Sequence, residues 1–194
     1  MIVAPFTRDI DRAFLEDAYG DYVSGYSTEG EAISLEASLY LLKQVSAGPV
    51  RRVVDLGSGW SSYVFRLYKK IANPALEVWS VDDSEEWLGT TARFLARHDL
   101  DTSNLRLWPR LGGARFDLTF YDMGRPWDRH QHLDRVLEAT SGVLICDDMH
   151  FEAYRGQVEA FAHARGRRLD LVRDETLDGL GRFSGRIAPV DHFS

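Results

Sequence analysis

The chain has 194 residues, of which 44% are hydrophobic and 27% are charged, and its formal net charge is −7. This size and composition are typical of one globular domain with a substantial hydrophobic core. The negative charge and the lack of a basic stretch disfavour a nucleic-acid partner. No stretch approaches the roughly 20 apolar residues of a membrane-spanning helix, and Met1–Phe6 is too short for a signal peptide. We therefore expect no membrane partner and a cytoplasmic location.

The first 49 residues are expected to form a helical cap that belongs to the same domain as the rest. Thr28-Glu29-Gly30-Glu31 has the form of a capping box and predicts the start of a helix. Apolar residues continue at helical spacing to Val45, and Gly48-Pro49 ends the helix.

Strands and helices alternate through most of residues 50–194. Strands are expected at Val50–Leu56, Glu77–Asp82, Leu105–Trp108, Phe116–Tyr121 and Gly142–Cys146. Helices follow the first, second, fourth and fifth strands, and Ser84 can cap the second of these helices. The tail differs, because Leu169–Arg173 and Arg182–Ala188 flank a glycine-rich turn and predict an antiparallel pair. The pattern predicts an α/β fold, with a mostly parallel seven-stranded sheet, helices on both faces and a C-terminal antiparallel hairpin.

A glycine turn, Asp55-Leu56-Gly57-Ser58-Gly59, joins the first strand to an amphipathic helix. Glycines let the backbone approach a ligand without a Cβ clash, and the helix start presents N–H groups to it. A dinucleotide motif would need a further glycine where Ser62 stands. The turn therefore predicts a nucleotide-like ligand and disfavours NAD(P).

Four segments in order resemble the motifs of class I S-adenosylmethionine-dependent methyltransferases: Asp55–Gly59, Val81–Asp83, Phe116–Asp122 and Val143–Asp148. The resemblance implies a Rossmann-like methyltransferase domain over residues 50–194, S-adenosylmethionine as cofactor and a small-molecule acceptor. It also places one acid near the methionyl amino group and another on the ribose hydroxyls, which suits a carboxylate because it accepts two hydrogen bonds. These two acids are Asp55 and Asp82. The implied cofactor-binding residues are Asp55, Gly57, Ser58, Gly59, Trp60, Ser61, Asp82, Asp83 and Asp122.

The chain departs from this family at two places. Ser61 stands where the family usually has its third glycine. Only Leu111–Arg115 separate the third and fourth strands, which is too short for the helix that supports the adenine in the family. The adenine contacts are therefore left unassigned.

Three acids follow the fourth and fifth strands, namely Asp122, Asp147 and Asp148. Neighbouring strand ends lie about 4.8 Å apart, so these carboxylates should converge and repel one another unless they are protonated or bind a cation. Oxygen ligands suit Mg²⁺, Ca²⁺ or Mn²⁺. The pattern resembles that of catechol-type, metal-dependent O-methyltransferases, which implies a divalent metal and an oxygen acceptor. The alternative is that Asp148 only caps the helix near Phe151.

The candidate catalytic residues are Arg125, His130 and His150. Arg125 stands where the metal-dependent enzymes have a catalytic lysine, but arginine stays protonated and cannot act as a base. The two histidines have suitable intrinsic pKa values, although His150 could equally be a plain loop residue.

The leading hypothesis is a methyltransferase that acts on an oxygen of a small molecule. A degenerate, non-enzymatic binding module is the second hypothesis, and an NAD(P)-dependent oxidoreductase is the third.

The single cysteine, Cys146, lies in an apolar run and is expected to be a buried structural thiol. Oligomerisation is left open. Five aromatic side chains are candidates for an acceptor pocket or for core packing: Tyr19, Tyr22, Tyr26, Trp60 and Trp127.

Overall fold

The computed structural model describes residues 10–188. The Met1–Phe6 stretch, the start of the expected helical cap (residues 1–49) and the end of the expected domain (residues 50–194) therefore lie outside the described residues. The strands are β1 (Arg52–Leu56), β2 (Glu77–Asp82), β3 (Leu105–Leu107), β4 (Phe116–Tyr121), β5 (Thr140–Cys146), β6 (Leu169–Leu171) and β7 (Gly185–Ile187). The helices are α1 (Arg12–Gly25), α2 (Leu35–Ser46), α3 (Trp60–Ile71), α4 (Glu85–Arg97), α5 (Leu133–Ala139), α6 (Glu152–His163) and α7 (Arg173–Thr176), with a 3₁₀ turn, η1 (Arg129–His132).

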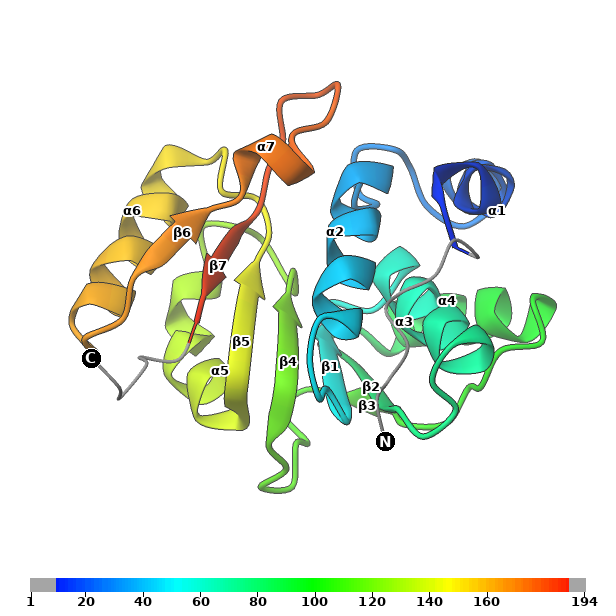
Figure 1. Cartoon of the computed structure of the whole chain (residues 1–194), viewed down its shortest axis with the longest axis horizontal. Coiled ribbons are helices and arrows are strands. Elements are labelled where there is room, and N and C mark those ends of the chain that lie inside the picture. The colour runs from blue at the N-terminus through cyan, green and yellow to red at the C-terminus, as the bar shows by residue number, and fades with distance from the viewer. Residues whose placement is uncertain (1–9, 189–194) are drawn as a thin grey trace.

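The strands form one seven-stranded sheet in the order β3-β2-β1-β4-β5-β7-β6 (Figure 1). The first five strands run parallel, whereas β7 pairs antiparallel with both β5 and β6. The predicted mixed sheet with a C-terminal antiparallel pair is confirmed. Strand order reverses beside β1, because the chain moves outward to β2 and β3 and then returns to β4. Ligands of open α/β sheets bind at the carboxyl ends of the strands at such a switch point.

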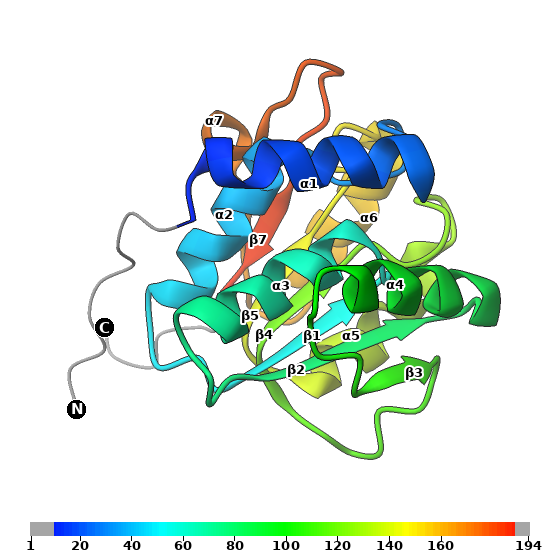
Figure 2. The same cartoon turned by 90° about the vertical axis from the view of Figure 1, so that its right-hand side faces the viewer.

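Helices cover both faces of the sheet, as Figures 1 and 2 show. Successive residues of a strand point to opposite faces, and β1 divides accordingly. Val53 packs in the hydrophobic core beneath α1 to α4, and Val54 packs in the second core beneath α5 and α6. Both side chains are fully buried. This two-sided burial explains why β1 is a continuous apolar run that ends in the glycine turn.

The start of α2 differs from the sequence prediction. The capping-box residues from Thr28 form a turn instead, in which the Ala32 N–H donates to the Thr28 carbonyl at 2.9 Å. The helix begins at Leu35, where Ser34 caps it by accepting from the Ala37 N–H at 3.1 Å. Gly30 disfavours helix within the predicted start. Residues 30–33 are thereby left as a loop near the carboxyl edge of the sheet.

Three other expected features are confirmed, whereas the last two strands differ in length from the prediction. Ser84 caps α4 by accepting from the Trp87 N–H at 3.2 Å. No helix lies between β3 and β4. Cys146 is buried and free, and burial raises the pKa of its thiol to about 12. Strands β6 and β7 are each shorter than expected, because α7 and a turn take up part of the connection. Within residues 10–188, no helix has the length and apolar character to cross a membrane.

Candidate functional site

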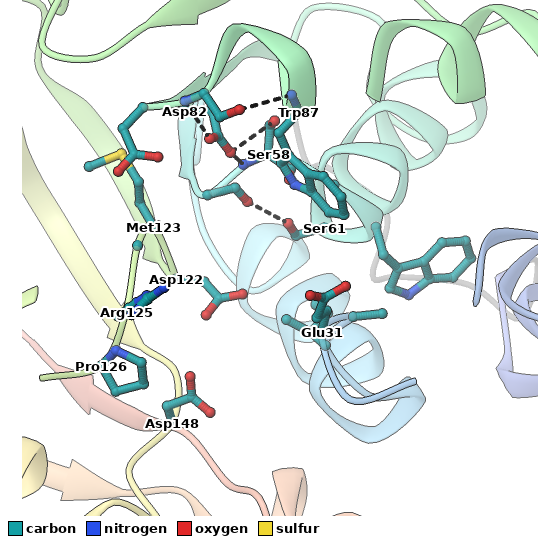
Figure 3. A pocket seen from close by; sticks show the side chains of 18 of the residues that line it. Glu31, Ser58, Ser61, Asp82, Trp87, Asp122, Met123, Arg125, Pro126 and Asp148 are labelled. Carbon is teal, nitrogen blue, oxygen red and sulfur yellow. Dashed lines mark hydrogen bonds between the residues drawn. The ribbon is translucent and has the colours of Figure 1, made fainter. Parts of the chain in front are cut away.

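A cavity of about 470 Å³ opens at the carboxyl ends of β1, β2 and β4 (Figure 3). Its wall comes from four segments of the chain: the loop 30–33, the glycine turn 57–61, the end of β2 with the start of α4, and the loop 122–126. Tyr22, Arg129 and Asp148 complete it. The volume falls within the usual range for small-molecule sites.

The glycine turn packs directly against the loop that follows β4. Gly57 has a φ of +108°, and a Cβ on it would stand 2.7 Å from the Asp122 carbonyl carbon and 2.7 Å from the Met123 nitrogen. A Cβ on Gly59 would stand 2.7 Å from the Tyr22 hydroxyl, which comes from α1. The two glycines therefore let two other parts of the chain approach the turn.

Asp55 lies beneath the turn and does not line the cavity. Its side chain is fully buried and accepts hydrogen bonds from the hydroxyls of Ser61, at 2.8 Å, and Ser62. Burial raises the Asp55 pKa to about 7, although the two hydroxyls oppose the shift. Asp55 therefore supports the turn, and its contact with the methionyl amino group stays a prediction. Ser61 does line the cavity.

Asp82 ties the end of β2 to the turn and also lines the cavity (Figure 3). Its Oδ2 accepts from the Ser58 N–H at 2.7 Å and the Ser58 hydroxyl at 3.1 Å, and its Oδ1 accepts from the Ser84 N–H at 3.0 Å. Burial raises the Asp82 pKa to about 6, and these hydrogen bonds oppose the shift. Because Oδ1 has a second lone pair, Asp82 can still accept from a ligand. The adjacent Asp83 is exposed at the cavity, and Trp87 donates its indole N–H to the Ser58 carbonyl.

Trp60 contributes mainly to the core. Its side chain is buried, stacks on Tyr63 with the ring centroids 4.7 Å apart, and donates to the Ser38 hydroxyl at 2.8 Å. Trp60 and Tyr22 reach the cavity wall, but the other three candidate aromatic side chains do not line it. These three are Tyr19, Tyr26 and Trp127.

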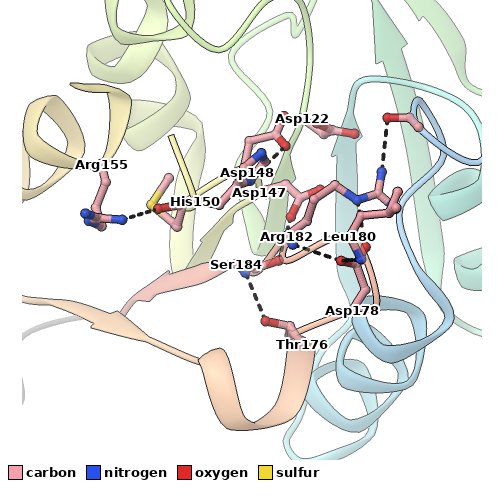
Figure 4. Close-up of polar contacts among 12 residues, drawn as sticks. Asp122, Asp147, Asp148, His150, Arg155, Thr176, Asp178, Leu180, Arg182 and Ser184 are labelled. Carbon is pink, nitrogen blue, oxygen red and sulfur yellow. Dashed lines mark hydrogen bonds and ion pairs between the residues drawn. The ribbon is translucent and has the colours of Figure 1, made fainter. Parts of the chain in front are cut away.

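A buried arginine lies among the acids that follow β4 and β5. Arg129 Nη2 is 2.8 Å from Asp122 Oδ1, and Arg129 Nη1 is 3.1 Å from Asp148 Oδ2. Burial raises the pKa of both carboxyls, while the Arg129 charge lowers them. Asp147 faces away from this pair and accepts from the Ser184 hydroxyl at 2.7 Å (Figure 4).

This arrangement does not fit the predicted metal site. Among residues 10–188, no group of three or more acids, histidines or cysteines is placed to hold a metal ion. Asp122 and Asp148 line the cavity, but Asp147 does not. The physical reason is that the Arg129 guanidinium already contacts both the Asp122 and the Asp148 carboxylates.

The candidate bases lie outside the cavity wall. His150 is packed against Phe151, and its Nδ1 is 3.6 Å from Asp148 Oδ1. His130 is exposed, and its Nδ1 lies 3.0 Å from the Trp127 carbonyl oxygen. Arg125 is exposed and does line the cavity (Figure 3). Asp148 does not cap α6 through its side chain.

Sequence reasoning missed several cavity residues. Glu31 lies in the expected capping box, which predicted only the start of a helix, while Trp87 and Met123 stand three and one residues beyond recognised features. The indole at position 87 could have been found, because the first turn of a capped helix at this edge faces the cavity. Nothing in the sequence distinguishes Arg129 from the other arginines.

One long-range contact fixes the loop 30–33. Arg182 Nη1 donates to the carbonyls of Gly30 and Ala32, each at 3.0 Å, while its Nε donates to Asp178 Oδ2 at 2.6 Å. Figure 4 shows Arg182 and Asp178 together beside the acids that follow β5. The cavity wall thus depends on a contact between the two ends of the described chain.

No protein-family model matches the sequence, and no curated protein sequence matches it. Solved structures do match the fold. The O-methyltransferase TomG from Streptomyces achromogenes, in complex with S-adenosylmethionine, is 14% identical with a TM-score of 0.67, and the match covers 94% of this chain and 91% of that one. An O-methyltransferase from Bacillus cereus, in complex with S-adenosylhomocysteine, is also 14% identical with a TM-score of 0.64, covering 96% and 94%.

A third neighbour has a different acceptor. The tRNA (m1A58) methyltransferase TrmI from Aquifex aeolicus is 16% identical with a TM-score of 0.59, covering 88% of this chain and 76% of that one. These structures share the fold with this chain, and their names do not give one common acceptor. The chain has the Rossmann-like fold of class I methyltransferases.

Proposed function

We propose that the chain is an S-adenosylmethionine-dependent methyltransferase that acts on an oxygen of a small molecule. The observation that carries this proposal is the meeting of the glycine turn, Asp82 and the acid after β4 at one cavity. This cavity lies at the carboxyl edge beside the switch point, where folds of this type bind ligands. The complexes of the two O-methyltransferases with S-adenosylmethionine and S-adenosylhomocysteine support the choice of cofactor.

The cavity residues suit the parts of this cofactor. Asp82 and Asp83 offer carboxylate oxygens to the ribose hydroxyls. The start of α3, with Gly59 as its N-cap, offers backbone N–H groups to the methionyl carboxylate. No residue of the short β3–β4 connection lines the cavity. We therefore assign the apolar surface for the adenine to Trp87 and Met123, which do line it. When bound, the cofactor supplies an electrophilic methyl group on its sulfonium.

The acceptor side of the cavity carries both carboxylate and guanidinium groups. Asp122, Asp148 and Arg129 form its floor, and Arg125 lies at its edge. The chain's task is to hold one acceptor oxygen in line with the methyl group and to take up its proton. The two carboxylates reach the cavity, whereas neither candidate histidine does. We therefore assign proton uptake to the carboxylates.

The cofactor assignment predicts a specific loss of binding. We expect the wild-type protein to bind S-adenosylhomocysteine in a calorimetric titration, and Asp82→Ala to weaken this binding at least about ten-fold, because both the ribose contact and the support of Ser58 are lost. Glu86→Ala, an exposed acid nearby in α4 that does not line the cavity, is the matched control and should bind like wild type. Circular dichroism checks that each variant is folded. Folded wild-type protein without binding, or undiminished binding by Asp82→Ala, contradicts the proposal.

A non-enzymatic binding module is the second candidate. The missing helix between β3 and β4 and the arginine at position 125 favour it. Incubation with radiolabelled cofactor and a panel of phenols, carboxylic acids and alcohols distinguishes the two, since any methylated product excludes a pure binding role. Competition between NADH and S-adenosylhomocysteine for binding tests the oxidoreductase hypothesis, which requires that the protein prefer NADH.

A further inference from the structure

Arg129 stands at the place where the carboxyl ends of two parallel strands bring acids together. The register of β4 and β5 pairs Tyr121 with Cys146, so Asp122 and Asp147 follow at the same edge. The Arg129 side chain is only 4% exposed, and its two terminal nitrogens lie 2.8 Å from Asp122 and 3.1 Å from Asp148. One guanidinium therefore bridges the acid after β4 and the acid after β5.

The surrounding chain fixes this guanidinium firmly. Arg129 Nε and Nη2 donate to the Gly124 carbonyl at 3.1 and 2.9 Å. The Arg129 carbonyl accepts from the Tyr121 hydroxyl at 2.9 Å, and the guanidinium carbon lies 5.8 Å from the centre of the Tyr154 ring. A buried arginine with this many partners is a permanent part of the site, because its removal would leave two largely buried carboxylates without a cation.

The remaining acid does not complete a metal site. Asp147 is held by Ser184 at 2.7 Å and does not line the cavity. A divalent ion between Asp122 and Asp148 would have to displace a positive group that already contacts both. Arg129 lines the cavity, although its Nη1 is buried and makes no hydrogen bond of good geometry within the described residues.

We propose that Arg129 takes the place of the divalent cation of metal-dependent O-methyltransferases, so that this cavity works without a metal. The inference rests on the proposed function. A metal ion can chelate two oxygens of an acceptor, whereas the terminal nitrogens of Arg129 already contact Asp122, Asp148 and the Gly124 carbonyl. The acceptor then does not need two neighbouring hydroxyls that chelate a metal. A single hydroxyl or carboxylate near Arg129 is enough for recognition.

The test measures binding of Mn²⁺ alone by electron paramagnetic resonance. Wild-type protein should bind no Mn²⁺ at concentrations up to about 1 mM, a range in which weak carboxylate sites fill. Arg129→Ala should gain one Mn²⁺ site, because the acids lose their cation. Arg129→Lys keeps the charge and should remain without a site, and so should Arg125→Ala, which removes an exposed arginine from the same cavity.

Two results would overturn the inference. One is stoichiometric Mn²⁺ binding by wild type that Asp122→Asn abolishes, and this measurement does not depend on whether Arg129→Ala folds. The other is a folded Arg129→Ala protein that gains no Mn²⁺ site. A separate titration of wild type with S-adenosylhomocysteine, with and without EDTA, tests the proposed function. If wild type does not bind S-adenosylhomocysteine, the proposed function fails, but the Mn²⁺ measurement is unaffected. Failures of the two proposals can therefore be told apart.

Discussion

Replacement of Gly57 by alanine should destabilise the protein by more than about 3 kcal/mol, the combined effect of a strained backbone and a steric clash. The φ of +108° is one that residues with a Cβ rarely adopt, and the added Cβ would stand 2.7 Å from two backbone atoms of the loop after β4. Backbone atoms cannot rotate away as a flexible side chain can. The loop 122–126 would have to move, and it forms part of the cavity wall.

Urea denaturation of Gly57→Ala and Gly20→Ala measures this effect against a matched control. Gly20 lies inside α1, and a Cβ there would meet nothing within 4 Å. Alanine at position 20 should therefore be neutral or stabilise by up to about 1 kcal/mol. An unchanged urea midpoint for Gly57→Ala would show that the turn and the β4 loop do not pack as described.

Replacement of Asp55 by asparagine should remove a pH dependence of the free energy of unfolding. The native pKa of Asp55 is raised to about 7 by burial, whereas an unfolded aspartate titrates near its ordinary value of 3.8. Between these two values the native protein holds a proton that the unfolded chain releases, so this group makes the wild type less stable as pH rises. The stability of Asp55→Asn relative to wild type should thus rise by about 4 kcal/mol from pH 4 to pH 7 and then level off.

The measurement is a series of urea titrations between pH 4 and pH 8, with the difference between the two proteins plotted against pH. Asp17→Asn, on the exposed side of α1, is the control for the aspartate-to-asparagine change itself. Since the asparagine amide can still bond Ser61 and Ser62, the variant should fold. A flat curve for Asp55→Asn would mean that Asp55 titrates in the native protein as it does in water.

Much of the fold follows from short-range patterns. The apolar run that ends at Leu56, the glycines after it and the cap at Ser84 are local signals, and each element appears where it is predicted. The start of α2 is the instructive failure. Both Thr28 and Ser34 are suitable caps, and the choice between them depends on residues 30–33 packing at the cavity edge, which is a tertiary effect.

The candidate site was harder to predict because its charges are balanced through space. Topology correctly brings Asp122 and Asp148 to one edge, but the cation that meets them comes from a short 3₁₀ turn with no sequence signal. Asp55 has the opposite problem. Its motif marks it as a ligand residue, but the motif does not indicate that its carboxylate accepts hydrogen bonds from the Ser61 and Ser62 hydroxyls beneath the turn.

The contact of Arg182 with the Gly30 and Ala32 carbonyls joins positions about 150 residues apart. Contacts of such long sequence separation form late, since most of the chain must be ordered before they close. During synthesis on a ribosome, β1 to β5 can emerge and pair while the loop 30–33 still lacks its anchor. A nascent chain would therefore acquire most of its sheet before Arg182 can anchor the loop 30–33 of the cavity wall.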